Sequence, residues 1–175
     1  MKICDVHENS IAFTTLDSDE RNDESNTKAS ATLDILKYIV EQGGEVVKGN
    51  DRGVTPLMAA MSTEVVEFLL DNGAEINART DHGGTALHRA ANNRKLAVAE
   101  ALVNAGADLN FTEDYHGYSA LHMAVDFNNI ERVTLLVNHG INRDLKDHNG
   151  ETALDLAKSK SKVNPTIVSL IEKGK

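Results

Sequence analysis

The chain repeats itself at intervals of 30 to 34 residues, and no other feature restricts its possible folds as much. Four stretches align on a hydroxyl residue: "DRGVTPLMAA", "DHGGTALHRA", "YHGYSALHMA" and "DHNGETALDLA". The aligned hydroxyl residues are Thr55, Thr85, Ser119 and Thr152. A unit of this length cannot cover its own apolar face, so successive units must pack against one another. The repeat therefore predicts an array of stacked units.

Each unit has the pattern of two short helices followed by a polar loop. The aligned hydroxyl suits the N-cap of the first helix, where it accepts a hydrogen bond from an unpaired backbone N–H. Pro56 falls at the first helical position, where its missing N–H is harmless. A second apolar run follows at helical spacing, as from Leu96 to Val103. A glycine such as Gly106 closes that run and supplies a left-handed helix stop. The polar, glycine-ended stretch after it predicts a projecting hairpin finger.

These units resemble ankyrin repeats, whose pattern is G-x-T-P-L-H-x-A-A, then V-V-x-L-L, then G-A-x-x-N. The stretch "GGTALHRAA…LVNAGADLN" matches it most closely, and the resemblance covers residues 51–175. "TLDILKYIVEQGGEVV", residues 32–47, resembles the second helix of an earlier unit. The resemblance implies an all-α repeat fold, an ankyrin-type solenoid of helix-turn-helix units with projecting hairpin fingers. It also implies that His88 and His122 are structural, each bonded to its anchor hydroxyl and to the backbone of the adjacent unit.

We expect residues 1–175 to form a single array. Its parts are a degenerate N-terminal unit at 1–50 with an acidic insertion at 17–30, internal repeats at 51–80, 81–113 and 114–146, and a C-terminal capping repeat at 147–175. "SIAFTTL" is the candidate for a degenerate first helix, and the insertion is expected to be a mobile, solvated linker. An acidic lid over one end of the array is the alternative. The first internal repeat lacks about one helical turn, which predicts a shortened first helix or a tighter turn between its helices.

Composition limits the classes of partner and the compartment. A net charge of −9 disfavours binding to nucleic acid or anionic lipid. Cys4 is the single cysteine, so neither an intramolecular disulfide nor a cysteine-based zinc site can form. The first residues lack the apolar run of a signal peptide, and no stretch reaches the roughly 18 apolar residues of a membrane helix. We therefore expect a cytoplasmic monomer.

The histidines raise the alternative of a metal protein or a histidine-dependent enzyme. His82 and His88 are six residues apart, as are His116 and His122, but this spacing recurs because the whole unit recurs. No H-E-x-x-H or phosphate-loop motif is present. Cys4 has a histidine three residues away but no orienting acid that the sequence can place. We therefore expect no catalytic residue, no metal and no cofactor.

The resemblance implies a protein-binding module that uses its concave face and finger tips, as an adaptor or stoichiometric inhibitor. Its acidity favours a partner with a basic surface, and an immunity or antitoxin-like role is one specific form. A structural part of a larger assembly is a further alternative. The candidate contact residues vary between units where the framework is constant. They are Arg52, His82, Arg89, Asn92, Asn93, Tyr115, His116, Tyr118, Met123, Asp126 and Phe127.

Two further expectations concern exposure within this set. The position after T-x-L-H, occupied by Ala59, Arg89, Met123 and Leu156 in successive units, is expected to be exposed. In the third unit, Tyr115, Tyr118, Met123 and Phe127 would together form an aromatic anchor on the concave face. The alternative is that Phe127 tucks into the turn between helices and Tyr118 packs on a neighbouring finger.

Overall fold

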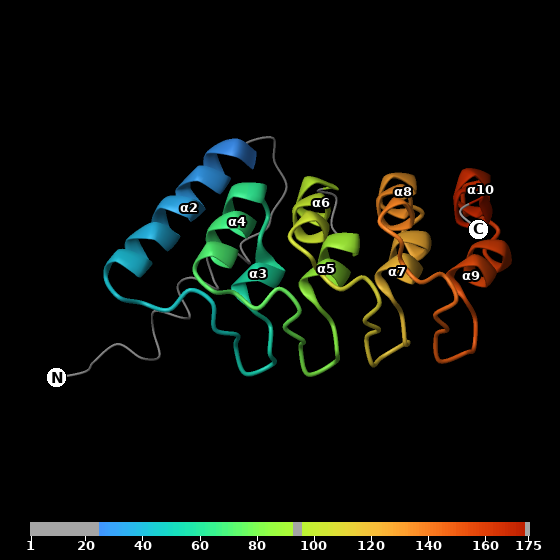
Figure 1. The fold of residues 1–175 in the computed structure, drawn as a ribbon, viewed down its shortest axis with the longest axis horizontal. Helices are drawn as coiled ribbons and strands as arrows, with labels where there is room; N and C mark the ends of the chain where they lie inside the picture. Colours follow the sequence, from blue (N-terminus) through green and yellow to red (C-terminus); the bar gives the residue numbers. More distant parts are fainter. Residues whose placement is uncertain (1–24, 93–95, 174–175) are drawn as a thin grey trace.

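The computed structural model describes residues 25–92 and 96–173, and their regular secondary structure is helical. The helices are α2 (Ser25–Glu41), α3 (Pro56–Ala59), α4 (Thr63–Asp71), α5 (Ala86–Asn92), α6 (Leu96–Asn104), α7 (Ala120–Asp126), α8 (Ile130–Asn138), α9 (Ala153–Ser159) and α10 (Pro165–Lys173). From α3 onward they form pairs stacked in one row, and the loops between pairs all project to the same side (Figure 1). This arrangement confirms the all-α repeat solenoid.

The helix boundaries follow the predicted capping residues. The side chains of Thr55, Ser119 and Thr152 each accept a hydrogen bond from the backbone N–H three residues later, and each begins a first helix. The second helices end at glycines in the left-handed region, with φ of +88°, +90° and +79° at Gly73, Gly106 and Gly140. A side chain there would be strained, so glycine sets where each second helix stops.

The first internal repeat has a shortened first helix, as expected from its missing turn. Helix α3 spans four residues, whereas α5, α7 and α9 span seven each. The chain leaves the helical conformation at Ala60, whose φ and ψ are −61° and 133°. Ser62 then caps α4 by accepting from the Val65 N–H. The deletion is therefore absorbed within the first helix and its turn.

The N-terminal unit differs from expectation in where its helix begins. Helix α2 starts at Ser25, so residues 25–30 of the expected acidic linker are the first turns of a helix. The rest of that linker, the "SIAFTTL" candidate, Cys4 and His7 lie outside the described residues. Helix α2 packs against α4, the second helix of the next unit, as its resemblance to a second helix implied.

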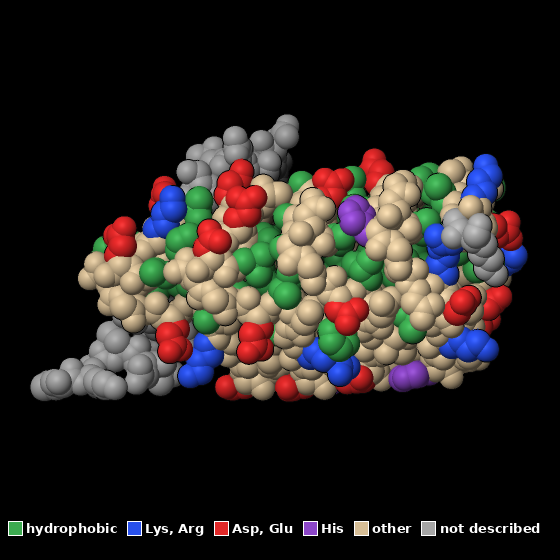
Figure 2. Space-filling view, in the orientation of Figure 1, with side chains coloured by type: hydrophobic (Ala, Val, Ile, Leu, Met, Phe, Trp, Pro, Cys, Tyr) green, Lys and Arg blue, Asp and Glu red, His purple; other side chains and the backbone are tan. Residues whose placement is uncertain are grey.

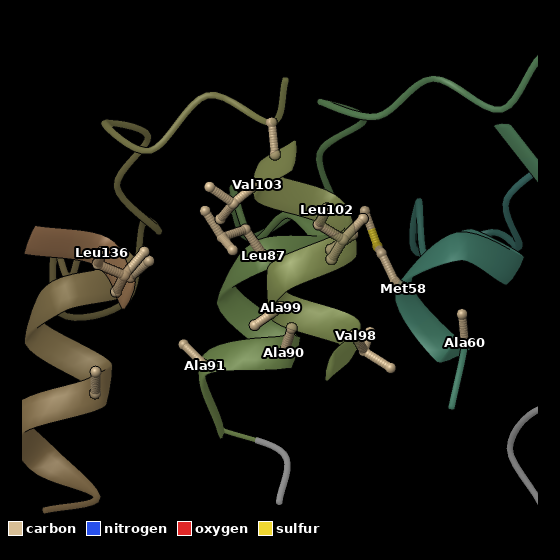
Figure 3. Close-up of a cluster of buried hydrophobic side chains, with 14 of the residues drawn as sticks. Met58, Ala60, Leu87, Ala90, Ala91, Val98, Ala99, Leu102, Val103 and Leu136 are labelled. Atoms are coloured by element: carbon tan, nitrogen blue, oxygen red, sulfur yellow. The ribbon is translucent and has the colours of Figure 1, made fainter. Parts of the chain in front are cut away.

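The core is built from aliphatic and small side chains shared between neighbouring pairs. Figure 3 shows Leu87 of α5 and Leu102 of α6 on facing sides of one pair, with Met58 approaching from α3 and Leu136 from α8. All four side chains are at least 95% buried. Each fully buried leucine contributes about 1.5–3 kcal/mol of transfer free energy. Since each pair covers the apolar face of the next, stability depends on stacking between neighbours.

Candidate functional site

His88 bridges its own helix start and the next unit. The Thr85 backbone N–H donates to His88 Nδ1 at 3.2 Å, and the Thr85 hydroxyl lies 2.9 Å from the same nitrogen. Because Nδ1 accepts, the ring proton is on Nε2, which donates to the Tyr118 carbonyl at 3.1 Å. Burial lowers the pKa of His88 below its ordinary value, which favours this neutral form.

His122 repeats the arrangement one unit later, which confirms the structural role that the resemblance implied. Its Nδ1 is 2.8 Å from Ser119 Oγ, and its Nε2 is 3.1 Å from the Glu151 carbonyl oxygen. Burial lowers the pKa of His122 as well. Both ring nitrogens of each histidine are thus bonded within the framework. In the described residues, no three His, Cys, Asp or Glu side chains are grouped to hold a metal ion.

The fingers are joined by backbone hydrogen bonds into a continuous ridge. The N–H of Asp81 donates to the Arg52 carbonyl, that of Asp114 to the His82 carbonyl, and that of His148 to the His116 carbonyl, at 2.8–3.0 Å. The side chains at all three accepting positions are exposed. The expected finger-tip residues Arg52, His82 and His116 therefore occupy the same place in successive fingers.

The sequence interpretation missed the side chains that hold these fingers together. Asn77 Oδ1 accepts from the Asp108 N–H, and Asn110 Oδ1 accepts from the Asn142 N–H, both at 2.9 Å. The shared asparagine of the two G-A-x-x-N stretches was the available signal, because it recurs in phase with the capping residues. An asparagine side chain at this place links its own finger to the next.

The candidates on the first helices lie on two adjacent helices, α5 and α7. Arg89 is exposed on α5, and Met123 is half-buried at the equivalent place on α7. Phe127 caps α7 one turn later with half of its surface exposed. Asp126 is half-buried and forms an ion pair with Lys160 of the last unit. We call Arg89, Met123, Asp126 and Phe127 the first-helix surface.

Two residues expected at this surface are buried instead. Ala59 and Leu156 stand at the position of Arg89, but they are only 7% and 5% exposed. Their prediction as exposed was wrong because both side chains are aliphatic, and burial against the adjacent helices is favourable for them. Arg89 keeps its guanidinium in water instead. Asn92 ends α5 and its side chain is not described, while Asn93 lies outside the described residues.

Tyr118 of the third unit makes ring contacts on two sides. Tyr118 is half-buried, and its ring stacks on that of His122 at 5.4 Å and 15°. On the finger side its centroid is 4.9 Å from that of His116. Burial, followed by the charge of Asp126, raises the pKa of Tyr118. Tyr118 therefore connects the finger, through His116, to the buried His122.

The comparisons with known proteins agree with this architecture. A family model described as ankyrin repeats, in three copies, matches residues 27–113 and 88–175. The chain is 34% identical over 131 residues, 73% of its length, to neurogenic locus notch homolog protein 1 of Xenopus laevis. It is 36% identical over 90 residues, 51% of its length, to human ankyrin repeat and SOCS box protein 6. The matches span 5% and 21% of these relatives. The chain belongs to the ankyrin repeat family.

Proposed function

We propose that this chain is a non-catalytic module that binds another protein through its first-helix surface and finger tips, as an adaptor or stoichiometric inhibitor. Ankyrin repeats generally mediate protein–protein interactions. One observation supports this surface for the chain itself. On a framework that is otherwise repeated, the equivalent side chain changes from the exposed cation Arg89 to the half-buried, apolar Met123, and the ring of Phe127 is half in water.

The chemistry of these side chains suits a binding surface. Phe127 and Met123 offer apolar area one helical turn apart, because the Phe127 N–H donates to the Met123 carbonyl at 3.0 Å. Arg89 forms no ion pair with another described residue, so its guanidinium is available to a carboxylate of the partner. Aromatic, methionine and arginine side chains are those enriched in the central parts of protein interfaces.

Charge indicates the type of partner. The net charge is −9, and on the face shown in Figure 2 acidic side chains occur along the length of the array, whereas basic ones are most frequent towards its C-terminal end. A field of this sign attracts a partner with a basic surface and makes association slower as salt rises. An immunity or antitoxin-like protein that masks a basic enzyme is one specific form of the proposal. None of the helices in the described residues is long and apolar enough to span a membrane.

The test uses the tagged chain as bait in an extract of the cells that express it, followed by affinity measurement with the recovered protein. The variant Arg89→Ala, Met123→Ala, Phe127→Ala should bind at least about 30-fold more weakly. The control, Glu67→Ala with Glu100→Ala, changes exposed residues of the second helices and should bind within about 2-fold. Equal affinity of the triple variant and the wild type would overturn the assignment of this surface.

A further inference from the structure

Finger three displays the most exposed large apolar side chain of the described residues. Tyr115 leaves 77% of its surface in water, compared with 63% for Tyr38 on α2 and 50% for Phe127. This finger is also one residue longer than the next. Its backbone closes between Glu113 and Tyr118, five residues apart, whereas the next finger closes between Asp147 and Glu151, four residues apart. The extra residue places a tyrosine at the tip.

The longer loop is held from inside by one carboxylate. Glu113 is 7% exposed, and its oxygens accept from the backbone N–H groups of Tyr115 at 2.6 Å, His116 at 2.7 Å and Tyr118 at 3.1 Å. Burial acts to raise the pKa of Glu113, but these donors outweigh it and lower the pKa below its ordinary value. The carboxylate is therefore ionised near neutral pH, and its bonds to the tip are the strong, charge-assisted kind.

Ring contacts fix the tyrosine further. The Tyr115 ring lies edge-on against the His116 ring, with centroids 4.5 Å apart and an interplanar angle of 88°. His116 in turn lies against Tyr118, which stacks on the buried His122. A series of four rings therefore runs from the tip into the core. No ring of another described residue packs in this way against Tyr38.

Both neighbouring fingers support the tip. On one side the Asp114 N–H donates to the His82 carbonyl at 2.8 Å, and on the other the His148 N–H donates to the His116 carbonyl at 2.8 Å. Gly117 lies directly against the backbone of His148, where even a methyl group would come within 2.9 Å of the backbone nitrogen. The loop that displays Tyr115 is thus fixed on three sides while the tyrosine ring itself faces water.

We propose that Tyr115 is a pre-positioned anchor that inserts its ring into an apolar pocket of the partner protein, and that Glu113 is the positioning residue that holds it there. This inference rests on the proposed function, since it assigns a specific contact to the same binding event. The pocket is one phenol ring wide, with a polar group at its base to satisfy the hydroxyl.

The physical reason is the entropy of binding. A mobile aromatic side chain must be immobilised on association, at a cost in affinity of several-fold, and a loop must be ordered as well. In finger three both are already ordered in the free protein. Tyrosine also has few rotatable bonds for its area, so most of the free energy of burying its ring appears as affinity.

The first experiment locates the contact. A photo-crosslinking phenylalanine analogue is introduced at Tyr115 in one sample and at Tyr38 in another, and each tagged chain is irradiated in an extract of the cells that express it. We expect the protein that the wild-type bait retains to be crosslinked from position 115 and not from position 38. The crosslinked peptide should belong to an apolar pocket of that protein.

The second experiment measures affinities for the crosslinked protein. Tyr115→Ser should bind about 30-fold more weakly, the loss typical of a central anchor. Glu113→Gln leaves the exposed surface intact but removes the charge that holds the loop, and should weaken binding about 3- to 10-fold. Asp147→Asn is the matched control, because Asp147 accepts from the Asn149 and Glu151 N–H groups in a finger without a displayed tyrosine. It should change stability as much as Glu113→Gln does while binding within about 2-fold.

The outcomes separate this inference from the proposed function. If the bait retains a protein through the first-helix surface but position 115 gives no crosslink, or Tyr115→Ser binds within about 3-fold of the wild type, the anchor is wrong and the binding function stands. If the Asp147→Asn control loses as much affinity as Glu113→Gln, Glu113 acts through stability alone. If the wild-type bait retains no protein, both proposals are overturned.

Discussion

Arg132 is expected to destabilise the protein, and replacing it by methionine should raise the stability of the array. Arg132 is the third residue after the Asn129 cap of α8, and it is 3% exposed. Its Nε and Nη2 find no hydrogen-bond partner in the described part of the chain. Equivalent positions in α4, α6 and α10 carry Val65, Val98 and Ile167, all buried. The chain has therefore placed a guanidinium where its other units place an aliphatic side chain.

The magnitude follows from the two unpaired donors. Leaving a buried donor unsatisfied costs about 1–3 kcal/mol, and burying an unpaired charge adds to that cost. Burial lowers the pKa of Arg132 for the same reason, since the charged form is the one that loses its water. Methionine preserves most of the length of the aliphatic stem, so little volume is lost. We expect Arg132→Met to stabilise the folded chain by about 1–4 kcal/mol.

The assay is urea denaturation at neutral pH, followed by helical circular dichroism. Arg89→Met is the matched control, because it removes the same charge and adds the same side chain on the exposed part of α5, and it should change the free energy of unfolding by less than about 0.5 kcal/mol. A fall in the urea midpoint of Arg132→Met relative to this control would refute the reasoning. It would mean that the guanidinium gains more from its surroundings than it loses in hydration.

Two other perturbations test the framework. Folding lowers the pKa values of His88 and His122 below 6.5, so as pH falls these histidines take up protons in the unfolded chain before they do so in the folded one. The stabilisation of the folded chain by the neutral histidines is therefore complete above about pH 6.5 and is lost as pH falls from there towards the folded pKa values. The urea midpoint should therefore be lower at pH 5 than at pH 7, and His88→Met should reduce that difference. A midpoint independent of pH would contradict this. Gly117→Ala should lower the melting temperature more than Gly150→Ala, since both have positive φ but only Gly117 meets backbone, at His148. Equal losses would show that conformational strain alone matters.

Periodicity predicted the fold because the periodic residues are those that stacking requires. The hydroxyl of Thr85 and the left-handed Gly106 act within a few residues of themselves, so their roles could be inferred from local sequence. The bridge from His88 to the Tyr118 carbonyl spans 30 residues. It was implied by the resemblance and not by the spacing, since nothing local to His88 specifies a partner in the next unit.

Burial at the candidate surface was harder to predict because it depends on neighbouring units. Arg89 and Leu156 occupy the same phase of the repeat, yet one is exposed and the other is 5% exposed. Glu113 was missed because the number of backbone N–H groups within reach of its carboxylate depends on how the loop folds: it accepts from three, whereas Asp147 in the shorter next finger accepts from two. Arg132 resembles an ordinary polar residue on a helix, and its place in the core is visible only when it is aligned with Val98.

The bond from a first helix to the following finger depends on the residue at the position of His88. His88 and His122 each have a following finger whose carbonyl accepts from Nε2. In the last unit the residue is Asp155, whose carboxylate accepts from the N–H and the hydroxyl of Thr152, at 3.0 and 2.7 Å. A carboxylate at this position therefore satisfies its own helix start but, unlike the two histidines, has no proton to donate to another finger.

The first internal repeat shows what happens when the bridging donor is absent within the array. Met58 stands at the histidine position, and its sulfur accepts only a weak bond from the Thr55 N–H at 3.4 Å. Its side chain extends towards Leu102 of the next pair instead (Figure 3). The contact between α3 and α5 therefore relies on apolar packing at this position, whereas the units after α5 and α7 are also joined by a partly buried hydrogen bond. The units that carry the first-helix surface and finger three therefore have a directional bond at this position that α3 lacks, and such bonds favour one register of stacking over others.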